Sequence, residues 1–152
     1  MVCLGNICRS PIAEGLLQQK VNETGLDVVV DSCGTGGWHS GENPDPRSIS
    51  KMLEKGYHID HQRSRKIHND DFSEFDRIYC MDQSNLEDVM RLAKTLNANH
   101  KVDLILNNKT YGREFEVPDP YYGAADGFEL VFQMLDKATD QIIEELKANS
   151  II

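Results

Sequence analysis

Segments typical of β-strands alternate with segments typical of α-helices along this chain of 152 residues. Residues 26–32 contain three consecutive valines, a β-branched apolar run that predicts a buried parallel strand. Further strands are predicted at residues 76–81 and 101–106. The expected helices cover residues 11–24, 45–56, 84–96 and 124–149. This alternation predicts an α/β fold with one doubly wound sheet of four parallel strands and helices on both faces.

The first strand is expected to be truncated, because only Met1 and Val2 precede the loop that begins at Cys3. A strand this short makes few ladder hydrogen bonds and buries little apolar surface, which weakens the centre of the sheet. A fold that tolerates a short strand, a trimmed chain and a start further upstream all stay open.

The loop at residues 3–9 carries a thiol at one end and a guanidinium at the other. Such a loop can curl into a ring whose backbone N–H groups bind an anion. The candidate phosphate ligands are therefore the residues between its ends, Leu4, Gly5, Asn6, Ile7 and Cys8. Arg9 adds a planar fork of donors that matches two phosphate oxygens. Ser10 is predicted to cap the next helix and Pro11 to take its first position, which places the loop at the positive end of a helix dipole.

Cys3 at the floor of this loop is expected to have a depressed pKa and to act as a thiolate nucleophile towards phosphorus. The alternatives are a small buried hydrophobe, the common fate of a cysteine, and half of a metal site with Cys8. No second Cys or His pair follows at a suitable spacing, and the Lys-Ser/Thr ending of a nucleotide-binding loop is absent. The sequence therefore favours thiol chemistry on a phosphate ester, with no metal and no cofactor.

Five separated motifs make the chain similar to the low-molecular-weight protein tyrosine phosphatases over nearly its whole length. V-C-L-G-N-I-C-R-S-P at residues 2–11 resembles the phosphate loop of that family. The other matches are D-S-C-G at 31–34, N-P-D-P-R at 43–47, C-M-D-Q-S-N at 80–85 and D-P-Y-Y-G at 119–123. The resemblance implies one phosphatase domain over residues 1–152 that hydrolyses phosphotyrosine or other aryl phosphate monoesters through a phosphocysteine intermediate.

Several polar residues are expected to support the loop. The Ser10 hydroxyl can donate to the Cys3 thiolate, besides or instead of capping the helix. Asn6 tolerates the left-handed backbone conformation and is expected to hold the loop in a strained shape. The resemblance implies that the Asn6 side chain joins a network with a serine and a histidine, at the positions of Ser32 and His61. An ordinary surface position is the alternative for His61.

Asp119 lies between Pro118 and Pro120 and is the candidate proton donor to the leaving group. A carboxyl group that faces a phosphate dianion should have a raised pKa, which suits a general acid. Without the Cys3 loop, Asp-Pro would be interpreted as a turn. Asp82 is expected either to support the loop or to cap the helix that follows it.

The aromatic residues Trp38, Tyr121 and Tyr122 are candidates for the walls of a substrate cleft deep enough for a phenyl ring. Core packing is the alternative for all three. The loops that carry Cys3, Trp38, Asp82 and Asp119 each follow a predicted strand, so they should meet at the carboxyl edge of the sheet. The related arginine phosphatases usually carry Thr at the position of Ile7, so Ile7 favours phosphotyrosine.

Cys8 lies in the same loop as the expected nucleophile. Oxidation of Cys3 to a sulfenic acid can be followed by a disulfide with Cys8, which protects against irreversible oxidation. The alternative is that Cys8 is a small packed residue. Cys33 and Cys80 are expected to be structural.

The bulk composition limits the partners. A formal net charge of −9 argues against nucleic acid and anionic membranes. The four cysteines form no disulfide-like framework, and no secretory signal or membrane-spanning run is visible, which favours the reducing cytoplasm. The expected partners are phosphotyrosine proteins or small aryl phosphates, with inorganic phosphate or vanadate as inhibitors.

Two rival functions stay open. A thiol-dependent arsenate reductase shares this kind of loop but needs a further cysteine pair, and residues 80–85 contain only Cys80. A non-catalytic phosphotyrosine-binding module would not need Cys3, Arg9 and Asp119 together.

Overall fold

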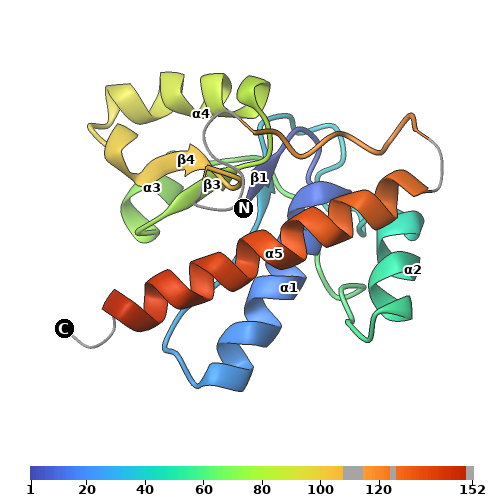
Figure 1. The fold of residues 1–152 in the computed structure, drawn as a ribbon. Helices are drawn as coiled ribbons and strands as arrows, with labels where there is room; N and C mark the ends of the chain where they lie inside the picture. Colours follow the sequence, from blue (N-terminus) through green and yellow to red (C-terminus); the bar gives the residue numbers. More distant parts are fainter. Residues whose placement is uncertain (108–114, 124–125, 150–152) are drawn as a thin grey trace.

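The computed structural model of this protein describes residues 1–107, 115–123 and 126–149 (Figure 1). A four-stranded parallel sheet forms the centre, with the strand order β2-β1-β3-β4. The strands are β1 (Val2–Cys3), β2 (Cys33–Gly34), β3 (Ile78–Cys80) and β4 (Val102–Leu104). The predicted parallel sheet is confirmed, β1 has only two residues, and β3 and β4 are shorter than the segments 76–81 and 101–106 that the sequence predicted for them.

Helices cover both faces of the sheet (Figure 1). The α-helices are α1 (Arg9–Thr24), α2 (Pro46–Glu54), α3 (Asp71–Glu74), α4 (Gln83–Thr95) and α5 (Asp126–Asn149), with a short 3₁₀ helix η1 (Asn99–Lys101). Helices α1, α2 and α5 pack against one another on one side, and α3 and α4 cover the other side. Helix α3 and η1 were not predicted from the sequence. Within the described residues, no helix has the length and apolar character needed to cross a membrane.

The prediction of a strand at residues 26–32 is wrong. These residues contain no regular secondary structure, and the strand beside β1 begins only at Cys33, which pairs with Val2. A parallel strand exists only where a neighbouring strand supplies hydrogen-bond partners. Residues 26–31 have no such neighbour on the side of β1, although Leu26, Val28 and Val30 still turn their side chains towards the core.

The turns at the helix ends explain much of the local structure. Gly25 ends α1 in the left-handed conformation, with φ of 70°, as its position predicted. Asp45 caps α2 by accepting a hydrogen bond from the backbone N–H of Arg47 at 2.8 Å. The predicted cap at Ser10 is wrong, because α1 already begins at Arg9 and Cys8 takes the cap position. The Ser10 hydroxyl is free for another purpose.

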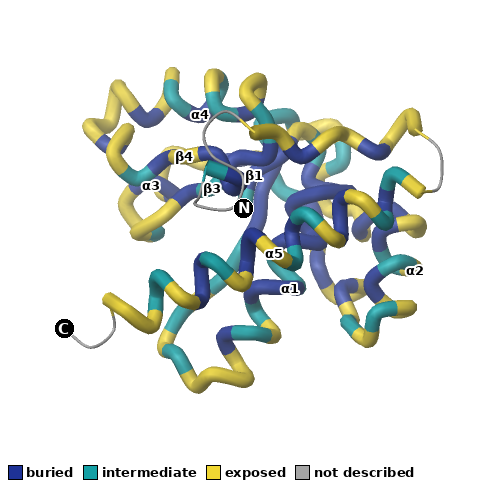
Figure 2. The backbone as a smooth tube through the Cα atoms, viewed as in Figure 1, coloured by how far each residue is buried: buried dark blue, intermediate teal, exposed yellow. Residues whose placement is uncertain are grey.

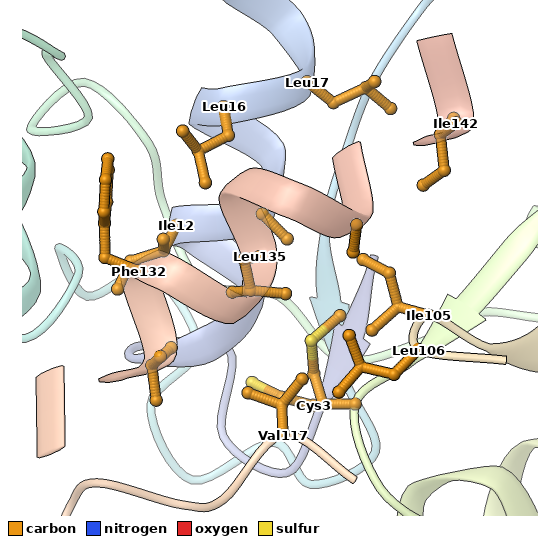
Figure 3. Close-up of a cluster of buried hydrophobic side chains, with 14 of the residues drawn as sticks. Cys3, Ile12, Leu16, Leu17, Ile105, Leu106, Val117, Phe132, Leu135 and Ile142 are labelled. Atoms are coloured by element: carbon orange, nitrogen blue, oxygen red, sulfur yellow. The ribbon is translucent and has the colours of Figure 1, made fainter. Parts of the chain in front are cut away.

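Two large clusters of buried apolar side chains hold the layers together. The buried stretches of the backbone run through the centre of the molecule (Figure 2). The larger cluster joins α1 to α5 and reaches the phosphate-loop candidate Cys3, which lies beside Leu106 and Val117 (Figure 3). The smaller cluster joins the sheet to α3 and α4. Because β1 lies between both clusters, the loop that follows it is anchored in the centre of the molecule.

Candidate active site

Residues 3–9 form the predicted ring at the carboxyl end of β1. Its backbone carbonyl groups accept hydrogen bonds from the surrounding scaffold: Cys3 from Thr35, Leu4 from Gly36, Gly5 from Ser64, Ile7 from Asp45 and Cys8 from Ser48, at 2.7–3.3 Å. In a planar trans peptide the following N–H points the opposite way from the carbonyl. Carbonyl groups held outwards therefore turn the N–H groups inwards.

The inward N–H groups are available to a ligand. The N–H groups of residues 4–8 donate to no acceptor in the part of the protein that the structure describes. Gly34 allows β2 to lie against this ring, because a side chain there would place Cβ 2.7 Å from the carbonyl oxygen of Leu4. The ring has the properties of an anion-binding nest.

Asn6 fixes the shape of the ring, as the sequence predicted. Its backbone is left-handed, with φ of 57°. Its side-chain amide donates to the hydroxyl oxygens of Ser10 at 2.8 Å and Ser32 at 2.9 Å, and its carbonyl oxygen accepts from the backbone N–H of Arg65 at 3.0 Å. These three bonds hold a residue in a conformation that would otherwise be unfavourable.

The third member of this network is Glu14 and not His61. The Ser32 hydroxyl donates to Glu14 Oε1 at 2.7 Å, whereas His61 is exposed and makes no hydrogen bond among the described residues. Burial raises the pKa of Glu14, which its hydrogen bond from Ser32 opposes. Glu14 follows Ser10 by four residues, and residues with this spacing lie on the same face of a helix. This spacing was the sequence signal that Glu14 lies near the loop.

The Ser10 hydroxyl lies within hydrogen-bond distance of the Cys3 sulfur. The two side chains lie 3.0 Å apart, from Cys3 Sγ to Ser10 Oγ, in a buried position. A hydroxyl has one proton, and Ser10 already accepts a hydrogen bond from Asn6. The proton of Ser10 is therefore available for a hydrogen bond to the sulfur of Cys3.

Arg9 is buried with part of its donor fork unused. Its Nη1 donates to Asp82 Oδ2 at 2.6 Å and to the carbonyl oxygen of Val117 at 3.0 Å. Its Nε and Nη2 make no hydrogen bond to any described residue, although Nη2 lies 3.7 Å from Asp119 Oδ2. Two donors on one edge of a fixed guanidinium match the spacing of two phosphate oxygens.

The guanidinium of Arg9 keeps its positive charge although it is buried. Burial lowers the pKa of Arg9, but the negative charges of Cys3, Asp82 and Asp119 outweigh this effect and raise the pKa above its ordinary value. Arg9 therefore stays cationic in a protein with a formal net charge of −9. It provides the local positive charge that a phosphate site requires.

The two candidate carboxylates have different positions. Asp82 is mostly buried and fulfils both expected roles, since Oδ1 accepts from the backbone N–H of Asn85 at 2.8 Å as the cap of α4 and Oδ2 holds Arg9. Asp119 is more exposed, with 40 % of its side chain accessible, and Oδ1 accepts from the backbone N–H of Tyr121 at 3.0 Å. Its Oδ2 makes no hydrogen bond to a described residue and lies near Arg9 at the mouth of the loop.

The aromatic candidates are surface residues and not core residues. Trp38 is 72 % exposed, Tyr121 38 % and Tyr122 93 %, and the rings of Tyr121 and Tyr122 meet edge to face. Leu4 on the ring itself is also exposed. Exposed aromatic side chains on the loops beside an anion site are available to a flat apolar group of a ligand.

Arg47 is a residue that the sequence analysis did not single out. Its Nε and Nη2 donate to the two carboxylate oxygens of Asp45, at 3.0 and 2.9 Å, and its Nη1 donates to the carbonyl oxygen of Tyr121 at 3.0 Å. The guanidinium also lies over the rings of Tyr121 and Phe128, with centroid distances of 5.3 and 4.8 Å. Arg47 thus ties the loop of Asp119 to α2 and α5.

Among the described residues, no group of three or more His, Cys, Asp and Glu side chains is arranged to hold a metal ion. The described site offers instead an inward ring of N–H groups, a buried cation and a thiol. These three groups lie at the carboxyl end of a parallel strand in an α/β protein. The arrangement is suited to a phosphatase.

Comparison with known proteins gives the class. The family model for low molecular weight phosphotyrosine protein phosphatases matches residues 1–151. A protein of that name from Schizosaccharomyces pombe is 43 % identical over 139 residues, which cover 89 % of this chain and 88 % of the relative. The chain belongs to the low molecular weight phosphotyrosine protein phosphatase family, and it is a hydrolase of that class.

Solved structures support the same assignment. A crystal structure of the protein tyrosine phosphatase from Entamoeba histolytica, with Hepes in its active site, superposes with a TM-score of 0.91 at 34 % identity and covers 98 % of this chain and 96 % of that one. The Drosophila arginine phosphatase superposes with a TM-score of 0.86 at 29 % identity, covering 96 % of this chain and 95 % of the other.

Proposed function

We propose that this protein hydrolyses phosphotyrosine and other aryl phosphate monoesters through a phosphocysteine intermediate on Cys3. The observation that carries the proposal is the meeting of three groups at one point: the Cys3 sulfur with the Ser10 hydroxyl at 3.0 Å, the two free donors of Arg9, and the unpaired N–H groups of the ring. Each of these groups stabilises negative charge on sulfur or on a phosphate.

In the first step the Cys3 thiolate attacks phosphorus while the bond from phosphorus to the aryl oxygen breaks. The equatorial oxygens accept hydrogen bonds from the ring N–H groups and from Nε and Nη2 of Arg9. Asp119 Oδ2 donates its proton to the leaving oxygen, so a neutral phenol departs and Asp119 becomes a carboxylate.

In the second step water attacks the phosphocysteine. The Asp119 carboxylate takes a proton from this water, the sulfur–phosphorus bond breaks, and inorganic phosphate leaves with the Cys3 thiolate restored. Inorganic phosphate, as the product, and vanadate, as an analogue of the five-coordinate phosphorus, are the expected inhibitors.

The substrate assignment rests on the rim of the site. Trp38, Tyr121 and Tyr122 offer exposed aromatic surface beside the ring, and the side chain of Ile7 in the loop is apolar. The aromatic surface suits a phenyl ring, and the apolar Ile7, at the position where the related arginine phosphatases usually carry Thr, favours phosphotyrosine over phosphoarginine. The four free thiols of this chain are consistent with the reducing cytoplasm, where phosphotyrosine proteins or small aryl phosphates are the expected partners.

An arsenate reductase remains the second candidate, because its loop chemistry also begins with a thiolate. The properties of Cys80 argue against it: this thiol is fully buried, and burial raises its pKa to about 12. Reduction of arsenate coupled to thioredoxin would identify the reductase. Turnover of phenyl phosphate without a thiol donor would identify the phosphatase.

The nucleophile is tested by Cys3→Ser and Arg9→Lys. Cys3→Ser should abolish turnover of p-nitrophenyl phosphate and still bind phosphate or vanadate, because the ring and Arg9 remain. Arg9→Lys should lose roughly 10²–10³-fold in kcat, because a lysine cannot supply two parallel donors. Arg63→Lys is the matched control, since Arg63 donates only to nearby surface carbonyl groups. Appreciable turnover by Cys3→Ser would contradict the mechanism. Turnover by the wild type above the Cys3→Ser control would dismiss the binding-module alternative.

The general acid is tested by Asp119→Asn against a series of aryl phosphates. The loss should be about 10²–10⁴-fold for poor leaving groups and much smaller for good ones, because a good leaving group needs no proton. Asp82→Asn should instead impair all substrates alike, through Arg9. A loss independent of the leaving group in Asp119→Asn would exclude Asp119 as the acid and make Asp82 the next candidate.

A further inference from the structure

The residues just before Asp119 are attached to the rest of the site. Val117 is fully buried, its N–H donates to the carbonyl oxygen of Met81 at 2.8 Å, and its own carbonyl oxygen accepts from Nη1 of Arg9 at 3.0 Å. Pro118 is the only residue between Val117 and Asp119, so the Cα atoms of these two residues lie at most about 7 Å apart. The position of the Asp119 carboxyl group therefore depends on how firmly Val117 is held.

Glu116 makes an attachment of a different kind. Its side chain is exposed, yet Oε2 accepts a hydrogen bond at 2.7 Å from the backbone N–H of Gln83, the first residue of α4. The first N–H groups of a helix have no partner inside the helix, and the helix dipole favours a negative charge beside them. The bond therefore joins the loop of Asp119 to the N-terminus of α4 through a single carboxylate.

Asp82 shows why this end of α4 matters to the site. Oδ1 of Asp82 accepts from the N–H of Asn85 at 2.8 Å, and Oδ2 accepts from Nη1 of Arg9 at 2.6 Å. The start of α4 therefore binds two carboxylates, and Asp82 is the one that orients Arg9. The second, Glu116, fixes the residues that lead to Asp119. The same turn of backbone thus holds both the phosphate clamp and the loop of the candidate acid.

The far end of this loop has its own attachment. Nη1 of Arg47 donates to the carbonyl oxygen of Tyr121 at 3.0 Å, and Oδ1 of Asp119 accepts from the N–H of Tyr121 at 3.0 Å. Asp119 therefore lies between two fastened points. At the first of them, Val117 is held by its backbone, whereas the bond made by Glu116 depends on a side chain and can be removed by one substitution.

We propose that Glu116 is a positioning residue for the reaction, and that its bond to Gln83 holds the loop so that Asp119 Oδ2 meets the leaving oxygen. The inference rests on the proposed function, in which Asp119 protonates the leaving group. Without this bond, the loop loses one of the three attachments that precede Asp119. Small displacements of a reacting group cost much of its effect, and a substrate with a good leaving group does not need the proton.

The test compares Glu116→Ala with the wild type on a series of aryl phosphates. For phenyl phosphate, which has a poor leaving group, kcat/KM should fall roughly threefold to tenfold, and for p-nitrophenyl phosphate it should change by less than about twofold. Inhibition by inorganic phosphate should be unchanged, because the ring and Arg9 remain in place. Glu116→Gln keeps an acceptor oxygen and should restore most of the loss.

Glu87→Ala is the matched control. Glu87 is an exposed carboxylate on α4, four residues after Gln83, and it makes no hydrogen bond or ion pair to any described residue. Its removal takes the same charge from this end of α4 without touching the loop, so the variant should behave as the wild type on every substrate. A loss in Glu87→Ala equal to that in Glu116→Ala would assign the effect to charge and contradict the inference.

A double variant shows whether Glu116 acts through Asp119. In Asp119→Asn the proposed acid is absent, so the further change Glu116→Ala should cause no additional loss on phenyl phosphate. A full additional loss would mean that the two residues act independently, and the proposal would be wrong. It would also be wrong if Glu116→Ala lost activity equally on all substrates, lost phosphate inhibition to the same extent, or was matched in its loss by Glu116→Gln.

The inference and the proposed function fail in different ways. If Asp119→Asn loses activity equally on all aryl phosphates, Asp119 is not the acid and both are overturned. If Asp119→Asn shows the expected dependence on the leaving group and Glu116→Ala does not, only the role of Glu116 is overturned.

Discussion

At the scale of single residues, the four thiols of this protein differ in their surroundings. Burial raises the pKa of Cys8 and Cys80 to about 12 and that of Cys33 to about 11. For Cys8, the negative charge of Asp45 adds to the effect of burial. A thiol with such a pKa is almost wholly protonated at neutral pH and reacts slowly with electrophiles.

Iodoacetate at pH 7 should therefore modify Cys3 first. We expect one carboxymethyl group per molecule, located on Cys3 by peptide mass spectrometry, with inactivation that follows the extent of modification. Inorganic phosphate should slow the reaction, because it covers the Cys3 sulfur. Modification of Cys8 at a comparable rate would contradict the protonated state assigned to that thiol.

The nearness of Cys8 to Cys3 leads to a prediction about oxidation. Peroxide converts the Cys3 thiolate to a sulfenic acid, and the Cys8 thiol can then displace water to form a disulfide. The charge of Cys3 is one cause of the raised pKa of Cys8, and it disappears when Cys3 becomes an uncharged sulfenic acid. Wild-type activity should return on treatment with a thiol reductant, whereas Cys8→Ser should recover poorly. If Cys8→Ser recovers its full activity after peroxide and reductant, Cys8 has no protective role and is only a packed residue.

At the scale of secondary-structure elements, Arg47 connects α2, α5 and the loop of Asp119. Arg47→Lys keeps the charge but cannot bind both oxygens of Asp45 and the carbonyl oxygen of Tyr121 together. We expect a drop of about tenfold in kcat for phenyl phosphate with little change in KM, because Asp119 is displaced while the ring is intact. The dependence on leaving group should become steeper than in the wild type. A purely structural role would lower the melting temperature and leave this dependence unchanged.

The elements that local signals define were predictable from the sequence. Gly25 and Asp45 define helix ends through their own backbone or side chain, and the left-handed backbone of Asn6 follows from its residue type. The strand prediction for residues 26–32 failed for a physical reason. A run of valines shows that a segment can form a strand, but a strand exists only where a neighbouring strand pairs with it. Among the described residues, the pairing of β2 with β1 begins only at Cys33.

Contacts between residues far apart in the sequence could not be predicted from local sequence patterns. The sequence predicted Cys3, Arg9 and Asp119 as members of one site, whereas Glu14 and Arg47 contact partners about 20 to 70 residues away, such as Ser32 and Tyr121. His61 was expected in the hydrogen-bond network of Asn6 and Ser32, in which the structure has Glu14 instead. A resemblance transfers a sequence position, but it does not transfer the contact that the side chain makes there. Ser10 was expected to bond Cys3, to cap the helix, or to do both, and the structure shows the contact with Cys3 and no cap. Its bond from Asn6 joins the same network.

At the scale of the whole molecule, a small number of ion pairs join parts of the sheet to the segments around it. Arg65 donates to both oxygens of Asp71 at 2.9 and 3.0 Å and to Asp31 at 3.1 Å. This cluster joins the start of α3 to the chain before β2. Burial raises the pKa of Asp71, but its hydrogen bonds from Arg65 and His68 outweigh burial and lower the pKa below its ordinary value.

The depressed pKa of Asp71 leads to a prediction about acid unfolding. The unfolded chain takes up this proton near pH 3.9, more readily than the folded protein does. The contribution of Asp71 to stability is therefore complete above about pH 4 and is lost as the pH falls through the lower folded pKa. Asp71→Asn should unfold at lower urea concentration than the wild type at pH 7, and the difference should shrink towards pH 3. Asp70→Asn is the matched control, because the Asp70 side chain is 72 % exposed. A difference between Asp71→Asn and the wild type that stays constant from pH 7 to pH 3 would show that Asp71 acts through packing or shape and not through its charge.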